Sequence, residues 1–284
     1  MSNRTAERQL QIVGVGLNPW KDAAIEAIRA IHESKSVFCA AFHADFAKAH
    51  MSDGADLQLI REHLEYERPR YRSYQIAAQR VLETLKQKNP VTWVTSGDPT
   101  INCGITRELL NRCCGLGVCV SLFSGITAQL AVNALLPTED RTDSFVQINA
   151  KDLFLSDVAI DPRFCLFVIQ VFQHVSHRML ASVQLNAVSL GPLQQRLLRF
   201  YQPQHRCHLV RAETAFAPAR FRSTTLAQLT STLTLIDPET TLVLPPRADR
   251  SGSYDESLAS LWETSDSTKC LSPIESLAQA QAMG

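Results

Sequence analysis

Tyrosine and arginine are concentrated in one short segment of this sequence. Three of the five tyrosines lie within the nine residues from Tyr66 to Tyr74, which read YERPRYRSY. Pro69 suits the first turn of a helix, because the N–H groups of that turn have no partner inside the helix. A helix that begins there places Arg70 and Tyr74 one turn apart on the same face. A phenol or phenolate could then take a proton while a guanidinium stabilises negative charge on an oxygen. The alternative is that these tyrosines only pack the helix.

Three glycine-containing segments follow apolar runs and could hold a ligand. They are Gly14-Val-Gly16-Leu-Asn-Pro19, Ser96-Gly-Asp-Pro-Thr-Ile101 and Ser124-Gly-Ile-Thr-Ala128. Glycine lets the backbone approach a ligand closely, and proline fixes the loop. An ordinary turn is the alternative, since both residues are common in turns. Within the second segment, Asp98 is expected either to contact a cationic group or to cap the turn that follows it.

The elements that must position these segments alternate between strand and helix. In the first half, apolar runs predict strands at 9–15, 35–41, 91–95 and 117–123. Helical periodicity predicts helices at 22–33, from 69 to about 88, at 105–113 and at 127–135. Such alternation implies parallel strands with crossover helices, and ligands of such sheets bind beyond the carboxyl ends of the strands. All three glycine loops are predicted to lie at those ends.

The composition changes after Pro137, where a polar stretch runs to about Pro162. Beyond it we expect strands at 164–171, 206–211 and 240–244, with helices at 192–201 and 225–233. The predicted organisation is therefore α/β, with an N-terminal parallel α/β domain at 8–137 and a C-terminal mixed α/β domain at 138–247. Residues 248–284 are expected to form a polar tail that is partly ordered at best.

The bulk properties favour a cytoplasmic protein without nucleic-acid or membrane partners. Lys plus Arg and Asp plus Glu both number 28 among 284 residues, so no net charge would steer the chain to nucleic acid or anionic lipid. No apolar run reaches the roughly 18 residues of a membrane span, and the first ten residues are polar. We expect no metal, because Cys113, Cys114 and Cys119 lack further zinc ligands at the usual spacing. The histidines at 43, 50, 63, 174 and 177 are interpreted as satisfied polar residues.

The first loop does not fit a dinucleotide oxidoreductase, because Pro19 stands where its fingerprint needs a third glycine. The order of the three loops instead resembles the tetrapyrrole methylase superfamily of S-adenosylmethionine-dependent methyltransferases, which has a glycine-rich first loop, a GDP motif and a PG-x-SA motif. Gly97-Asp98-Pro99 matches the GDP motif, whereas Leu17-Asn18 replaces Pro-Gly, and Ser124 and Thr127 replace Pro and Ser. Over residues 10–247 this resemblance implies two α/β domains of the class III methyltransferase type, with a cofactor cleft between them. It implies cofactor contacts from Gly14, Gly16, Pro19, Ser96, Gly97, Asp98, Pro99, Thr100, Ile101, Ser124, Gly125, Thr127, Ala128 and Gln170.

Within that superfamily, the tyrosine segment resembles the RYxSY segment of borosin-type peptide backbone N-methyltransferases. Residues 167–171 resemble the family's strand with a cofactor-contacting glutamine, and 241–247 resemble its closing strand. The resemblance implies that Arg70, Tyr74 and Tyr66 are catalytic, although Tyr66 stands four residues before Arg70, where the family has about six. It also implies S-adenosyl-L-methionine as cofactor, a homodimer, and a precursor peptide as substrate. The tail has no Val/Ile/Gly-rich core, so we expect that peptide to be a separate chain.

Three alternatives use the same fold. A corrin or porphyrin C-methyltransferase would share the loops but leaves the tyrosine segment without a role. An rRNA methyltransferase is disfavoured by the absence of net charge and of a basic run. A binding module without catalysis is the third, in which Leu17, Asn18 and Ser124 have degraded the donor site.

Overall fold

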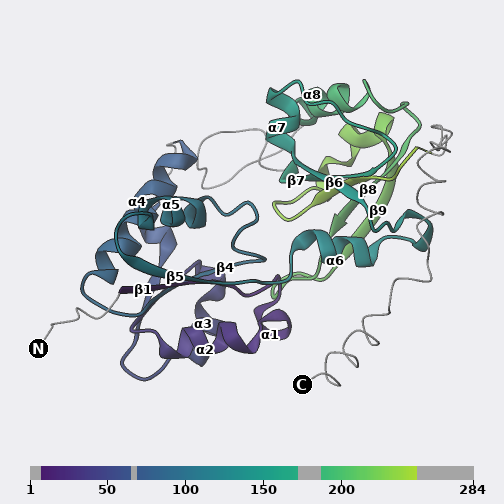
Figure 1. Cartoon of the computed structure of the whole chain (residues 1–284). Coiled ribbons are helices and arrows are strands. Elements are labelled where there is room, and N and C mark those ends of the chain that lie inside the picture. The colour runs from purple at the N-terminus through teal and green to yellow at the C-terminus, as the bar shows by residue number, and fades with distance from the viewer. Residues whose placement is uncertain (1–7, 65–68, 172–186, 248–284) are drawn as a thin grey trace, which may run out of the picture. The chain divides into compact units, whose positions relative to one another are not determined.

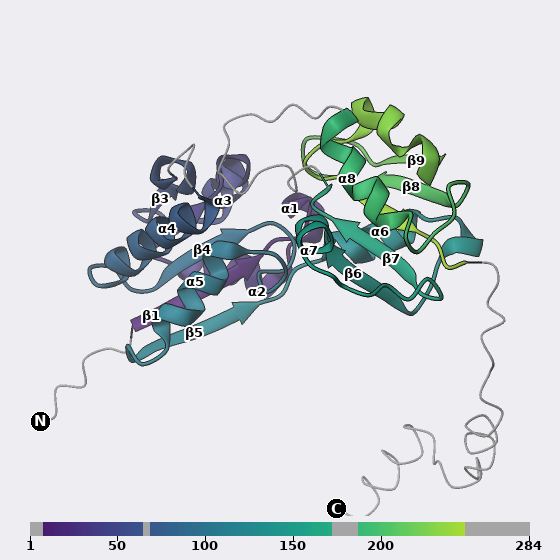
Figure 2. The ribbon, with the colours of Figure 1, turned by 90° about the horizontal axis from the view of Figure 1, so that it is seen from above.

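The first of two five-stranded sheets is wholly parallel and has the strand order β3-β2-β4-β1-β5 (Figures 1 and 2). The computed structural model describes residues 8–64, 69–171 and 187–247. The crossover from β1 to β2 passes β4, and that from β4 to β5 passes β1, so β1 and β4 meet where the connections change direction. That position is where ligands bind in sheets of this type. The strands are β1 (Arg8–Gly14), β2 (Ser36–Cys39), β3 (Asp56–Leu59), β4 (Val91–Thr95) and β5 (Val118–Phe123).

Helices cover both faces of this parallel sheet. In Figure 1, α4 (Arg70–Leu85) and α5 (Gly104–Cys113) lie on one face, and the helices before β3 lie on the other. Successive side chains of a strand point to opposite faces, so Leu10 and Ile12 pack with α4 and α5 while Val13 and Val15 pack with α2 and α3. The remaining helical elements of this half are α1 (Pro19–Asp22), α2 (Ile25–Glu33), η1 (Ala41–His43), α3 (Ala44–His50) and η2 (Ile60–His63).

The second sheet is mixed and has the strand order β6-β7-β10-β8-β9. Only β6 and β7 pair in parallel, and the other neighbours are antiparallel. Its strands are β6 (Phe145–Asn149), β7 (Cys165–Ile169), β8 (Arg206–Arg211), β9 (Arg220–Thr225) and β10 (Thr241–Leu244). The accompanying helices are α6 (Ala128–Leu135), η3 (Thr138–Asp140), α7 (Ala150–Leu155), α8 (Ala187–Leu197) and η5 (Leu226–Leu235). The two sheets confirm the α/β fold class.

The polar stretches of the sequence hold elements that the pattern analysis missed. β3 lies within 43–67, and β6 and α7 lie within 138–162, so Val91–Thr95 is the fourth strand of the chain and not the third. β3 and β6 are edge strands whose residues are at most half-buried, which explains their weak apolar signal. The helix predicted at 192–201 begins earlier and contains Pro192, and the one predicted at 225–233 is the 3₁₀ element η5.

Residues up to Pro246 form one compact unit, and the predicted tail at 248–284 lies outside the described residues. Among the described residues, every helix falls short of the length or hydropathy that crossing a membrane requires.

Candidate functional site

The backbones of the three glycine loops touch one another at the carboxyl ends of β1, β4 and β5. A Cβ placed on Gly125 would lie 2.3 Å from the carbonyl oxygen of Gly97, and one on Gly14 would lie 2.4 Å from that same oxygen. The Gly97 N–H donates a hydrogen bond to the Gly16 carbonyl, with an N–O distance of 2.8 Å. Gly97 also has a positive φ of 64°. Only glycine permits these contacts, which explains why each loop carries one.

The carboxylate of Asp98 joins the second loop to the third. Its Oδ1 accepts a hydrogen bond from the Thr100 N–H at 2.8 Å, and its Oδ2 accepts one from the Gly125 N–H at 3.3 Å. Burial raises the pKa of Asp98, but hydrogen bonds from Thr100, Ser124 and Gly125 together bring this pKa below its usual value. Asp98 therefore stays ionised and caps its own turn, which is one of the two roles that the sequence suggests.

A cavity lies beside these loops and is closed on another side by residues of the second sheet; we call it the loop pocket. Seven of the predicted cofactor residues line it: Ser96, Gly97, Asp98, Ile101, Thr127, Ala128 and Gln170. The other residues of its lining were not among the predicted cofactor contacts, and they are Leu17, Asn102, Gln129, Ile169, Pro238, Glu239, Thr240 and Thr241. Asp98 and Glu239 are its charged residues, and no Lys, Arg or His of the described chain lines it.

The remaining predicted cofactor residues do not line the loop pocket. Most of them join the loops to one another through close contacts and hydrogen bonds, namely Gly14, Gly16, Pro99, Ser124 and Gly125. Pro19 is buried in the first turn of α1, where Asn18 accepts a hydrogen bond from the Trp20 N–H at 3.3 Å. Thr100 lines the neighbouring cavity instead.

That second cavity has a volume of about 440 Å³, and we call it the helix pocket. Pro69 precedes α4 as predicted, and both Arg70 and Tyr74 line the helix pocket from the first turns of α4. Tyr66 lies outside the described residues. The helix pocket is within the size range of ligand sites. Its other lining residues are Pro69, Tyr71, Thr100, Asn102, Cys103, Gly104, Arg107, Asn149, Lys151, Asp152 and Gln170.

The ring of Tyr74 packs against the start of α5. A Cβ placed on Gly104 would lie 2.2 Å from a ring carbon of Tyr74, so glycine at this position makes room for the tyrosine. Burial raises the pKa of the Tyr74 phenol, and the positive charges of Arg70 and Arg107 oppose that rise only in part. The Tyr74 phenol is therefore protonated at neutral pH.

Asn102 and Gln170 line both cavities, so these two residues mark where the loop pocket and the helix pocket meet. They are also the two non-glycine residues with positive φ in the described chain, at 53° and 55°. The Oε1 of Gln170 accepts a hydrogen bond from the Asn149 side chain, and the Oδ1 of Asn149 accepts one from the Lys151 N–H at 2.9 Å. Strained backbone of this kind is concentrated at functional sites.

His43 contacts Ser96, a residue of the loop pocket, and the sequence analysis missed this role. It follows β2, its Nε2 lies 2.8 Å from the hydroxyl of Ser96, and it is 1% exposed. Its Nδ1 has no hydrogen-bond partner among the described residues. Burial lowers the pKa of His43 to about 4, so the imidazole is neutral at physiological pH. The sequence signal for this role was the position of His43 just after a parallel strand, where ligand sites form.

The chemistry of the loop pocket fits S-adenosylmethionine. This molecule carries a sulfonium and an ammonium cation, a carboxylate, and hydroxyl and amine groups. Carboxylates suit the cations, and hydroxyl and amide side chains such as Thr127, Gln129 and Gln170 suit the polar groups.

Comparisons with known proteins agree with this geometry. The chain is similar to the solved structure of the methyltransferase CobJ, with 16% identity, a TM-score of 0.58, and coverage of 84% of this chain and 95% of that one. It is also similar to uroporphyrin-III-C-methyltransferase from Thermus thermophilus, with 20% identity, a TM-score of 0.61, and coverage of 84% and 94%. No curated protein matches the sequence. At these identities the two structures show a shared fold, whereas residues 9–229 match the family of tetrapyrrole (corrin/porphyrin) methylases itself. The chain therefore belongs to the tetrapyrrole (corrin/porphyrin) methylases and is an S-adenosylmethionine-dependent methyltransferase.

Proposed function

We propose that this enzyme methylates backbone amide nitrogens of a peptide that is supplied as a separate chain. The observation that carries the proposal is the presence of Arg70 and Tyr74 together in the lining of the helix pocket. A ring-methylating enzyme could use Arg70 to bind substrate carboxylates, but it has no evident need for Tyr74 beside it.

In this proposal the two cavities have separate roles. The methyl donor occupies the loop pocket, and the acceptor amide occupies the helix pocket. Methyl transfer then takes place where the two cavities meet, beside Asn102 and Gln170. Holding both reactants at one junction supplies the proximity that a two-substrate reaction needs.

Tyr74 and Arg70 are assigned complementary tasks. An amide N–H is a very weak acid, and negative charge develops on the carbonyl oxygen as its proton leaves. The raised pKa of Tyr74 makes its phenolate a strong base, although only a small fraction is ionised at neutral pH. The guanidinium of Arg70 stabilises the oxygen of the resulting imidate. Arg107 and Lys151 add positive charge to the same cavity, and Asp152 is the negatively charged residue among the described residues that line it.

The same positive charge favours a second candidate, which is methylation of a ring carbon in a polycarboxylate tetrapyrrole. Arg70, Arg107 and Lys151 would then bind the carboxylates of the macrocycle. Both solved structures named above are of methyltransferases, and one of them is a uroporphyrin-III-C-methyltransferase. In this reading Tyr74 has no chemical role.

Mass spectrometry after incubation with S-adenosylmethionine separates the two candidates. Peptide methylation predicts mass gains in steps of one methyl group, located on backbone nitrogens by fragmentation. Arg70→Gln should abolish these gains, whereas Arg72→Gln, two residues along the same helix and outside the helix pocket, should keep them. A coloured methylated tetrapyrrole with no peptide product would refute the proposal. The homodimer that the family resemblance implies is part of the same proposal, and sedimentation of the purified enzyme checks it.

A further inference from the structure

We infer that Glu239 senses the positive charge of the methyl donor, so that the loop pocket holds the charged donor more tightly than the reaction product. The inference rests on the assignment of the donor to the loop pocket. It does not depend on which acceptor the enzyme uses.

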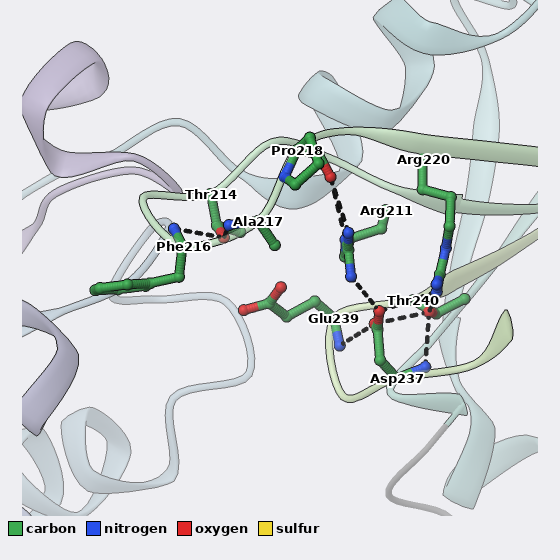
Figure 3. Close-up of polar contacts among 9 residues, drawn as sticks. All are labelled: Arg211, Thr214, Phe216, Ala217, Pro218, Arg220, Asp237, Glu239 and Thr240. Carbon is green, nitrogen blue, oxygen red and sulfur yellow. Dashed lines mark hydrogen bonds and ion pairs between the residues drawn. The ribbon is translucent and has the colours of Figure 1, made fainter. Parts of the chain in front are cut away.

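The turn that presents Glu239 is fixed by a cluster of charged residues (Figure 3). Asp237 Oδ2 accepts hydrogen bonds from Arg211 Nη1 at 2.6 Å and from Arg220 Nη2 at 2.9 Å. Its Oδ1 accepts hydrogen bonds from the Thr240 hydroxyl at 2.8 Å and from the Glu239 N–H at 3.1 Å. Arg211 Nη2 also donates to the Pro218 carbonyl at 3.0 Å, which ties the turn to the loop between β8 and β9. The backbone of Glu239 is therefore held in place without any contribution from its own side chain.

The carboxylate of Glu239 points away from this cluster in Figure 3 and lines the loop pocket. It makes no hydrogen bond or ion pair with another described residue. Asp98, the other carboxylate of the loop pocket, has its two oxygens occupied by Thr100 and Gly125. Glu239 is thus the carboxylate that is available to a ligand. Glu239 is an exposed residue, but partial desolvation and the negative charge of Asp237 raise its pKa, and Arg211 opposes this, so a cation in the pocket would favour the ionised form.

The methyl donor and the product of the reaction differ in charge at sulfur, and a carboxylate can distinguish them. S-adenosylmethionine carries a positive sulfonium centre, and methyl transfer leaves S-adenosylhomocysteine, whose sulfur is neutral. The ammonium and carboxylate groups are the same in both molecules. A carboxylate near the sulfur position would therefore attract the donor and lose that attraction once the methyl group has left. Product release would be assisted by the reaction itself.

Calorimetric titration of Glu239→Gln with the donor and with the product tests the inference. We expect the Kd for S-adenosylmethionine to rise about tenfold, which corresponds to two unit charges about 6 Å apart in a half-solvated site. The Kd for S-adenosylhomocysteine should change less than about twofold by the same reasoning. Glu213→Gln is the matched control, because Glu213 pairs with Lys21 outside the loop pocket. Equal losses for both ligands, or no loss for the donor, would overturn the inference.

The pH dependence of binding provides a second and independent measurement. In the wild type, the preference for the donor over the product should shrink between pH 8 and pH 5 as Glu239 takes up a proton. Asp98, whose pKa is lowered, stays charged across that range, and the other charged groups that face Glu239 are Asp237 and Arg211, which form an ion pair with each other. In Glu239→Gln the preference should be nearly constant. The same slope in both proteins would overturn the inference, and unfolding in urea would show that both are folded.

Discussion

The buried imidazole of His43 makes the stability of this enzyme depend on pH. Burial lowers the pKa of His43 from the usual 6.5 to about 4, so the folded state resists protonation. The unfolded chain takes up a proton at this position once the pH falls below about 6.5. The contribution of the neutral imidazole is therefore fully present above pH 6.5, decreases as the pH falls, and is lost below about pH 4.

The magnitude follows from the two pKa values. A pKa that is lowered from 6.5 to about 4 corresponds to about 3 kcal/mol in the free energy of unfolding. At pH 5 about 2 kcal/mol of this should already be lost. That is a large effect for a protein of ordinary stability.

Urea unfolding at 25 °C, followed by circular dichroism at pH 7 and pH 5, measures this loss. The wild type and His43→Gln should differ in their pH dependence by about 2 kcal/mol, because glutamine does not titrate. His32→Gln is the control, since His32 is exposed and its replacement should leave the acid sensitivity of the wild type in place. If His43→Gln loses as much stability between pH 7 and pH 5 as the wild type does, the reasoning about His43 is wrong.

Three further predictions test the close contacts between the glycine loops, the role of Tyr74 as the base, and the turn at Asp237. Gly125→Ala should cost about 1–3 kcal/mol in the free energy of unfolding, because the added Cβ would lie 2.3 Å from a backbone oxygen. The control is Gly191→Ala in α8, where no described atom lies within 4 Å of the added Cβ, and it should be neutral or stabilising. The logarithm of the methylation rate should rise with pH between 7 and 9 with a slope near 1 if the phenolate of Tyr74 is the base, because its pKa is raised, and Tyr74→Phe should be almost inactive at every pH; a flat wild-type profile would contradict this. Asp237→Asn should weaken binding of the donor more than binding of the product in calorimetry, because it releases the turn that presents Glu239; equal loss of both ligands would count against that account.

The parallel sheet and its loops could be predicted because they depend on local patterns. Each strand of the first half except β3 lies in an apolar run followed by a glycine loop or a helical element, and parallel strands bring such loops to one edge. The position of Pro69 likewise predicted the start of α4, and that start brings Arg70 and Tyr74 to one cavity.

The other walls of the site depend on contacts that no local pattern records. Glu239 lines the loop pocket because two arginines from β8 and β9 hold Asp237, and these residues are far from the glycine loops in the sequence. Edge strands such as β6 are half-exposed and lack an apolar run, so Asn149 could not be placed beside Gln170 in advance. Long-range pairing, which the sequence does not display, decides these positions.

The left-handed backbone of Gln170 lowers the thermal stability of the enzyme, whereas the side chain of Gln170 serves turnover. A left-handed conformation costs an ordinary residue roughly 1–2 kcal/mol, which glycine would avoid at an entropic cost of about 0.5–1 kcal/mol. Laboratory evolution under thermal selection alone should therefore accept glycine at position 170. The amide that links the junction of the two cavities to Asn149 would disappear with that change. An evolved variant with glycine at position 170 should consequently have a higher Tm and a lower kcat. Gln170 would then be a residue that is retained for catalysis alone.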